Sequence, residues 1–166
     1  GSDPFVVMPS ADVAQAAKVA VTARVQNAGQ SCICAKRMIV HADVHDAFAE
    51  AFIAGMRAVK IGDPMDEATE MGPLSSVEQR DTVLGQLATA RAAGATLVGG
   101  EAIDRPGAWM TAGVLSDVPL TSDVAREELF GPVAMLFRAT DIDEAIAIAN
   151  ATPYGLGSSV WTNDDG

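Results

Sequence analysis

The sequence predicts an α/β protein in which helices flank a mostly parallel sheet. Three observations support this prediction. Short apolar runs typical of buried strands alternate along the chain with longer segments that have helical periodicity. Gly, Pro and other turn-forming residues separate these segments. Hydrophobic residues make up 49% and charged residues 20% of the 166 residues, a balance typical of one globular domain rather than of a disordered or coiled-coil protein.

The strands are expected where short, mostly apolar runs lie between turn-forming residues. Such runs fit strands that are buried on both faces, as in parallel sheets covered by helices. They occur at residues 5–8, 38–40, 96–98, 114–115, 133–137 and 158–161.

The helices are expected where apolar residues recur at a spacing of three or four. Four segments meet this description, at residues 11–27, 43–56, 75–93 and 141–149. A polar residue that can accept hydrogen bonds from the free amides of the first turn stands at the start of each. The expected caps are Ser10, Asp43, either Ser75 or Ser76, and Asp141.

Charge and cysteine content exclude several classes of protein. The chain has 11 Lys and Arg against 22 Asp and Glu, so its net charge is -11, which disfavours binding to nucleic acid and to anionic membranes. No charged and then apolar leader opens the chain, and no apolar run reaches the roughly 18 residues of a membrane span. Two cysteines one residue apart form no secreted disulfide framework, so a cytoplasmic location is expected.

The segment around Cys32 is the one most suited to chemistry. Gly29 permits an unusual backbone between a helix and a strand, so the Cys32 thiol can be exposed and backed by amides that hold an oxyanion. Lys36 and Arg37 can favour the reactive thiolate. The residues alone favour the alternative that Cys32 and Cys34 are small buried apolar residues, because no activating base stands beside the thiol.

A zinc site is the second alternative for these cysteines. Cys32, Cys34, His41 and His45 form a C-x-C…H-x₃-H series. The histidine spacing suits zinc, but ligating cysteines are normally two to four residues apart, and a strand separates the two pairs. No bound metal is therefore expected.

Four motifs in one order carry a resemblance to a known family. They read G-Q-S-C at residues 29–32, K-x-G-D-P…T-x-x-G-P-L at 60–74, E-E-L-F-G-P-V at 127–133 and N-x-x-x-Y-G-L at 150–156. Together they resemble the aldehyde dehydrogenase superfamily, and the resemblance covers essentially the whole chain. It implies that residues 1–166 are the cysteine-bearing catalytic domain of such an enzyme, in truncated form.

The resemblance implies oxidation of an aldehyde to a carboxylic acid with NADP or NAD as cofactor. Cys32 would be the nucleophile that forms a thiohemiacetal, and its amide would help to hold the oxyanion. Glu128 would bind the nicotinamide ribose, and Phe130 would pack near the nicotinamide. Ser31 and Ile33 would line the pocket of the small-molecule aldehyde.

Within the superfamily, the sequence is most similar to bacterial succinate-semialdehyde dehydrogenases, which are often NADP-dependent. Some members have an Arg six residues before the nucleophile that binds the substrate carboxylate. Gln26 stands there instead, and Arg24 is a candidate substitute for this role. Cys34 is a possible redox partner of Cys32, although a disulfide between residues i and i+2 is strained.

The resemblance also implies that this sequence is part of a longer enzyme. The general base, a second oxyanion donor and the nucleotide-binding fold would precede residue 1, and the oligomerisation strand would follow residue 166. The chain alone is therefore expected to be inactive, and the full-length enzyme is expected to be a homo-oligomer. The alternative is a non-enzymatic remnant that acts as a binding or interaction domain, and the flanking sequence would discriminate between the two.

Overall fold

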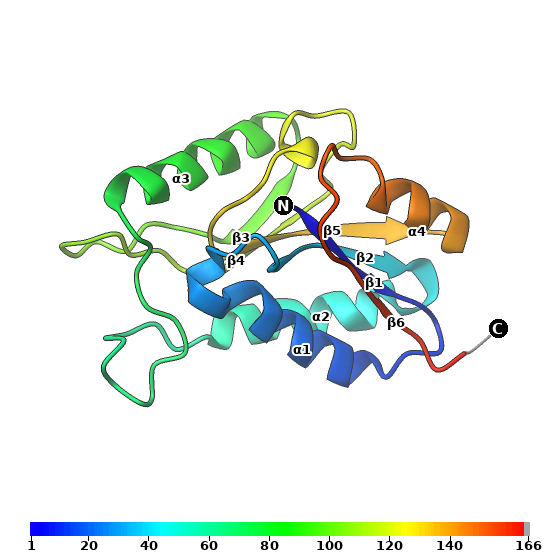
Figure 1. The fold of residues 1–166 in the computed structure, drawn as a ribbon, viewed down its shortest axis with the longest axis horizontal. Coiled ribbons are helices and arrows are strands. Elements are labelled where there is room, and N and C mark those ends of the chain that lie inside the picture. Colours follow the sequence, from blue (N-terminus) through cyan, green and yellow to red (C-terminus); the bar gives the residue numbers. More distant parts are fainter. Residues whose placement is uncertain (165–166) are drawn as a thin grey trace.

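The computed structural model describes residues 1–164, in which six strands form one sheet with the order β3-β4-β5-β2-β1-β6 (Figure 1). All neighbouring pairs are parallel except β3 and β4, which are antiparallel. This confirms the predicted fold class. The strands are β1 (Asp3–Val7), β2 (Ala35–His41), β3 (Thr96–Gly99), β4 (Gly113–Ser116), β5 (Val133–Ala139) and β6 (Ser159–Trp161).

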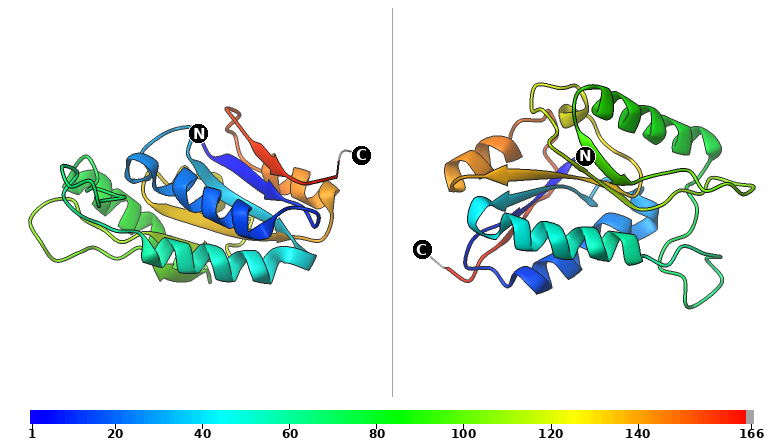
Figure 2. Two further views of the ribbon diagram at one scale, coloured as in Figure 1. Left: turned by 90° about the horizontal axis from the view of Figure 1, so that it is seen from below. Right: turned by 180° about the vertical axis from the view of Figure 1, so that it is seen from behind.

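Helices cover both faces of the sheet (Figure 2). Helices α1 and α2 pack together on one face, whereas α3 and α4 lie on the other (Figure 1). They are α1 (Val13–Val25), α2 (Ala42–Ala58), α3 (Val77–Ala92) and α4 (Ile142–Ala149), with short 3-10 turns η1 (Gln26–Gly29) and η2 (Val124–Arg126).

The core lies around the two central strands, β2 and β5. Because helices cover both faces, these strands are buried on both sides, as their apolar runs predict. Aromatic rings extend the core under α2: Phe5 of β1 lies 6.5 Å from Phe48, which stacks on Phe52 at 5.4 Å. Phe5 also stacks on Trp161 of β6 at 5.3 Å, which ties the edge strand to the core.

The predicted cap of the first helix, Ser10, is wrong. Asp12 caps α1, because its carboxylate accepts a hydrogen bond from the Gln15 amide at 3.0 Å. The Ser10 hydroxyl instead contacts Thr162 at 2.8 Å and accepts a hydrogen bond from the Asn163 amide at 2.9 Å. Ser10 therefore joins the first loop to the segment after β6.

The predicted cap of the second helix, Asp43, is also wrong. His41 caps α2, because its Nδ1 accepts a hydrogen bond from the Asp43 amide at 3.2 Å, and Asp43 lies in the first turn. The predictions for the other two helices are confirmed: Ser76 caps α3 and Asp141 caps α4.

The topology gathers three segments at one edge of the sheet. The cysteine-bearing loop leads into β2, the segment that contains Glu128 leads into β5, and the start of the chain leads into β1. Since β5, β2 and β1 are parallel neighbours, the segments that precede them meet at their amino-terminal ends.

Candidate active site

A left-handed turn separates α1 from the cysteine. The helix ends at Val25, short of the predicted residue 27, because Asn27, Ala28 and Gly29 have φ values of 51°, 52° and 75°. Left-handed backbone is costly for residues other than Gly and is found at functional sites that the surrounding structure supports. Asn27 Nδ2 donates to Gln30 O at 2.9 Å and Gln30 Nε2 donates to Asn27 O at 3.1 Å, which braces this turn.

Arg24 supports the turn from the protein interior. Its side chain is fully buried, and its guanidinium donates to the carbonyl oxygens of Gly29 and Ala35. Burial lowers the pKa of Arg24 to about 10. The suggestion that Arg24 binds a substrate carboxylate is therefore wrong, because this group is enclosed and bound to backbone.

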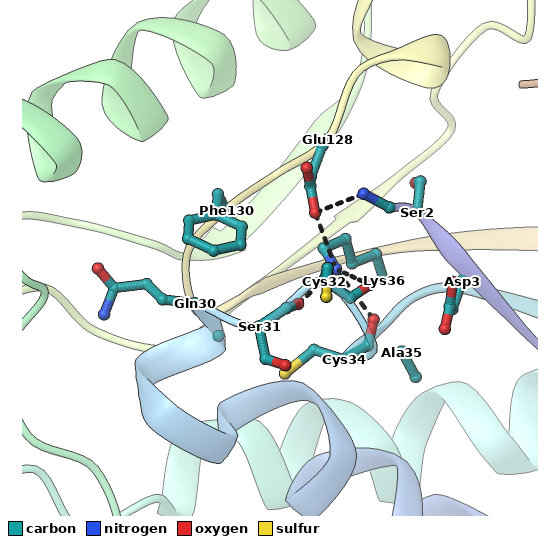
Figure 3. Close-up of polar contacts among 12 residues, drawn as sticks. Ser2, Asp3, Gln30, Ser31, Cys32, Cys34, Ala35, Lys36, Glu128 and Phe130 are labelled. Carbon is teal, nitrogen blue, oxygen red and sulfur yellow. Dashed lines mark hydrogen bonds and ion pairs between the residues drawn. The ribbon is translucent and has the colours of Figure 1, made fainter. Parts of the chain in front are cut away.

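Lys36 lies at the centre of the site and is also fully buried (Figure 3). Its ammonium donates to Ser31 O at 2.8 Å, Cys34 O at 3.1 Å and Cys32 O at 3.2 Å. It also lies 3.3 Å from Glu128 Oε1. Burial lowers the pKa of Lys36, the Arg24 charge lowers it further, and Glu128 opposes both effects. Lys36 therefore joins the cysteine loop to Glu128.

The segment around Glu128 is held by two glutamines of α3. Gln79 Nε2 donates to Phe130 O at 2.9 Å. Gln86 Nε2 donates to Glu128 O at 3.2 Å and to Glu127 Oε2 at 2.9 Å. The segment has little regular structure, so these side chains provide bonds that a strand or helix would otherwise supply.

A pair of glycines brings the cysteine loop against this segment. Gly29 packs on the carbonyl group of Gly131 so closely that a Cβ atom on Gly29 would overlap it. Phe130, which precedes Gly131 and is half-buried, therefore lies beside the cysteine loop (Figure 3). The first and third motifs of the sequence thus meet directly.

The motif at residues 60–74 supports the cysteine loop from another side. Gln30 Oε1 accepts a hydrogen bond from the Ser75 amide at 2.9 Å, directly after this motif. Within the motif, Gly62 packs against the Thr69 hydroxyl, and the Lys60 amide donates to Glu70 Oε2 at 2.8 Å. Its residues therefore shape the loop that supports the site.

The predicted site residues differ in their exposure to solvent. Cys32 and Ile33 are exposed, the latter at 64%, whereas Ser31 is half-buried. Cys34 is 2% exposed, and its thiol donates to Gln26 O at 3.5 Å. Cys32 is thus the accessible thiol, as expected for a nucleophile.

Arg37 does not serve the cysteine in the way the sequence suggested. Its guanidinium donates to Ser2 O at 3.0 Å and to Ile148 O and Ala149 O at 2.8 and 2.7 Å. These contacts tie β2 to the start of β1 and to the last turn of α4. Arg37 is therefore a structural cation.

Two cavities are lined by residues close to Cys32 in the sequence, although Cys32 itself lines neither. One, of about 410 Å³, is lined by Ile33, Leu156 and Trp161 among others. The other, of about 540 Å³, lies between α1 and α2 and includes Gln26 in its lining. Within residues 1–164, no Lys or Arg side chain lines either cavity.

The sequence placed Gln30 in the first motif without giving its side chain a role, and it did not single out Gln79 and Gln86. The spacing of Gln79 and Gln86, seven residues apart and thus on one helix face, was the only signal for this pair. Such spacing is common on solvated helices, so it did not point to a segment distant in sequence.

The structure bears on two further possibilities, a metal site and a membrane-spanning helix. No group of three or more His, Cys, Asp or Glu side chains that could hold a metal ion occurs among residues 1–164. Over the same residues, every helix is too short or too polar to span a bilayer.

Glu128 fits a role in binding cofactor hydroxyls, because its buried Oε1 has ion-pair contacts but accepts no hydrogen bond, so it retains acceptor capacity.

Comparisons with known proteins agree with this geometry. Over 165 residues the chain is 57% identical to the succinate-semialdehyde dehydrogenase [NADP(+)] of Mycolicibacterium paratuberculosis, and the match covers 99% of this chain and 35% of that protein. The structure matches lactaldehyde dehydrogenase from Escherichia coli with a TM-score of 0.95 and 35% identity, covering 99% of this chain and 35% of that chain.

A second solved structure, 3,6-anhydro-L-galactose dehydrogenase in complex with NAP, matches with a TM-score of 0.94 and 37% identity, over 99% of this chain and 35% of that chain. The chain thus spans about a third of the length of these relatives. The family model for the aldehyde dehydrogenase family matches residues 1–166. The chain therefore belongs to the aldehyde dehydrogenase family.

Proposed function

We propose that the protein containing this chain oxidises an aldehyde to a carboxylic acid, with Cys32 as nucleophile and NADP+ or NAD+ as hydride acceptor. The observation that carries the proposal is the exposed Cys32 thiol, three residues after a braced left-handed turn and close to the Glu128 carboxylate, whose Oε1 accepts no hydrogen bond. The name of the paratuberculosis relative and the NAP complex of the solved relative support NADP+.

In the proposed reaction, the Cys32 thiolate attacks the carbonyl carbon, and the aldehyde oxygen takes the negative charge. The Cys32 amide donates a hydrogen bond to that oxygen, while Ser31 and Ile33 border the substrate. The nicotinamide cofactor, when bound, accepts the hydride that leaves the thiohemiacetal carbon. Water then cleaves the Cys32 thioester, which releases the acid and restores the thiol.

Glu128 and Phe130 are proposed to receive the cofactor. A carboxylate can accept hydrogen bonds from two ribose hydroxyls, and a half-buried ring beside the cysteine loop offers an apolar surface to the nicotinamide. The remaining cofactor contacts are proposed to come from segments outside this chain. Cys34 remains a proposed redox partner, and its thiol would first have to leave the protein interior.

Succinate semialdehyde is the proposed substrate, because mycobacterial relatives of 52–57% identity are named succinate-semialdehyde dehydrogenases. Its carboxylate needs a cation, and the two cavities lined by Ile33 and by Gln26 have none in their lining within residues 1–164. We propose that another segment of the full-length protein supplies it. A carboxylate-binding cation should make kcat/KM for succinate semialdehyde at least about tenfold higher than for butanal, a difference worth about 1.4 kcal/mol.

The test is the NADP+-dependent oxidation of succinate semialdehyde by the full-length gene product, followed through NADPH absorbance. C32A should abolish turnover, whereas C34A, its neighbour of equal size, should retain it within about tenfold. Residues 1–166 alone should not turn over. Activity of C32A equal to that of the parent protein would disprove the role of Cys32.

A further inference from the structure

We propose that Lys36 is a positioning residue that sets the oxyanion donor of the cysteine loop and the Glu128 carboxylate from a single point. The inference deepens the proposed function and rests on it, since it takes Cys32 as the nucleophile and Glu128 as a cofactor ligand. Lys36 touches neither the substrate nor the reacting atoms in this proposal. It acts through three carbonyl groups and one carboxylate.

The donor count of Lys36 is the first step. An ammonium group has three N–H donors and no acceptor. All three are used by the carbonyl oxygens of Ser31, Cys32 and Cys34, at 2.8 to 3.2 Å. Because the side chain is fully buried, water cannot take the place of these bonds when they break. The Ser31 oxygen also accepts a hydrogen bond from the Cys34 amide at 3.2 Å. Lys36 is the group that contacts all three loop carbonyls and so contributes to the orientation of each.

Peptide planarity extends this effect to the amides of the loop. The carbonyl of Ser31 and the amide of Cys32 belong to one planar trans peptide unit, so they point in opposite directions. When Lys36 holds the Ser31 oxygen on the buried side, the Cys32 N–H is turned the other way. In the same manner, the bond to Cys32 O orients the amide of Ile33. Lys36 thus aims the N–H that the proposed mechanism uses for the oxyanion.

Glu128 is held by charge rather than by a hydrogen bond. Since three carbonyls use the ammonium donors, the 3.3 Å contact to Glu128 Oε1 is an ion pair, and the Gly1 amino group forms a second one with the same oxygen at 2.9 Å. These ion pairs locate the carboxylate (Figure 3), and Oε1 accepts no hydrogen bond. The cysteine loop and the proposed cofactor ligand share one reference point.

The experiment compares K36M with R37M in the full-length gene product. Arg37 is the matched control, because it is the adjacent residue, is 2% exposed and also donates to three backbone carbonyls, none of them in the loop of residues 31–34. Hydrogen exchange of amides 31–34 should accelerate about tenfold or more in K36M. At saturating NADP+, kcat should fall about 100-fold, the effect of losing one oxyanion donor. R37M should change both by less than about threefold.

Coupling to Glu128 is tested through the KM for NADP+. E128Q and K36M should each raise this KM. E128Q should not accelerate hydrogen exchange of amides 31–34, whereas K36M should. The double variant should have the same KM as E128Q, because Lys36 acts on the cofactor through Glu128. If K36M does not fold, K36Q takes its place: it keeps donors but loses the charge, so it should retain part of the exchange protection and show the raised KM.

Three results would overturn the proposal: loop exchange in K36M equal to that in R37M, an unchanged kcat, or fully additive effects of K36M and E128Q. The exchange measurement needs no substrate. Failure of the proposed function, seen as no aldehyde oxidation or as activity of C32A, is therefore distinguishable from failure of the role of Lys36.

Discussion

The amino-terminal and carboxyl-terminal edges of the parallel strands differ in how deeply their charged side chains are buried. At the amino-terminal edge, Arg24, Lys36 and Arg37 are each 2% exposed or less and are bound to backbone carbonyls. At the carboxyl-terminal edge, Arg138 pairs with Asp46, and these side chains are 47% and 85% exposed. Burying a cation costs free energy unless it is paired or hydrogen-bonded. Within residues 1–164, the buried cations lie at the amino-terminal edge.

The difference indicates which edge holds the function. Ligands in open parallel sheets usually bind at the carboxyl ends of the strands. Here the left-handed turn of residues 27–29, the buried cations and the exposed cysteine all lie at the amino ends, where family motifs precede β2 and β5. Substitutions at the amino edge should therefore have large effects, whereas equivalent ones elsewhere should be tolerated.

The largest effect is expected for G29A. This residue has a φ of +75°, and a Cβ would overlap the Gly131 carbonyl, so the unfolding free energy should fall by about 4 kcal/mol in urea titrations. The control is G85A in the middle of α3, where nothing lies within 4 Å of the added methyl group. It should stabilise the protein by about 0.5–1 kcal/mol. Equal losses for both variants would contradict the special role of Gly29.

R24M should have the next largest effect. It removes the guanidinium donors that bind the carbonyl oxygens of Gly29 and Ala35, which should cost about 3 kcal/mol of unfolding free energy. K18M is the matched change on the exposed side of the same helix and should stay within about 0.5 kcal/mol. A small effect of R24M on the urea midpoint would show that the left-handed turn stands without its buried cation.

Local patterns predicted the elements because burial on both faces leaves continuous apolar runs in β2 and β5. They could not decide between neighbouring caps. Ser10 and Asp12 are both good capping residues, and the choice depended on Asn163, which lies at the other end of the chain and binds Ser10. The strand order and the antiparallel pairing of β3 also depend on contacts between distant segments.

The site was only partly predictable for the same reason. The motifs indicated Cys32 and Glu128, and the structure joins the two through Lys36. The sequence suggested that Lys36 favours the reactive thiolate, but its ammonium binds three loop carbonyls and Glu128. Nearness along the chain does not show which atoms a side chain contacts. The burial of Arg24 likewise follows from the left-handed turn, whose shape depends on the packing of Gly29 against a segment distant in sequence.

At the carboxyl-terminal edge, D141A tests an ordinary helix cap. Asp141 accepts a hydrogen bond from the Glu144 amide at 2.8 Å, and its loss should cost about 1 kcal/mol. D143A in the first turn of the same helix removes only a favourable charge near the helix dipole, about 0.3–1 kcal/mol at most. Thermal unfolding of both variants measures the difference, and a loss near 4 kcal/mol for D141A would erase the contrast between the two edges.

The smallest effect concerns the acid sensitivity of Asp46. A hydrogen bond from His45 and then the Arg138 guanidinium hold the pKa of this carboxyl below its usual value. A carboxylate with a lowered pKa adds stability above the unfolded value of about 3.9, and this stability is lost as the pH falls through the folded value. The difference between parent protein and D46N in urea midpoint should therefore be constant above about pH 5 and shrink below about pH 4. Because both side chains are exposed, 0.5 M NaCl should reduce it, and a salt-independent difference would indicate a buried contact instead.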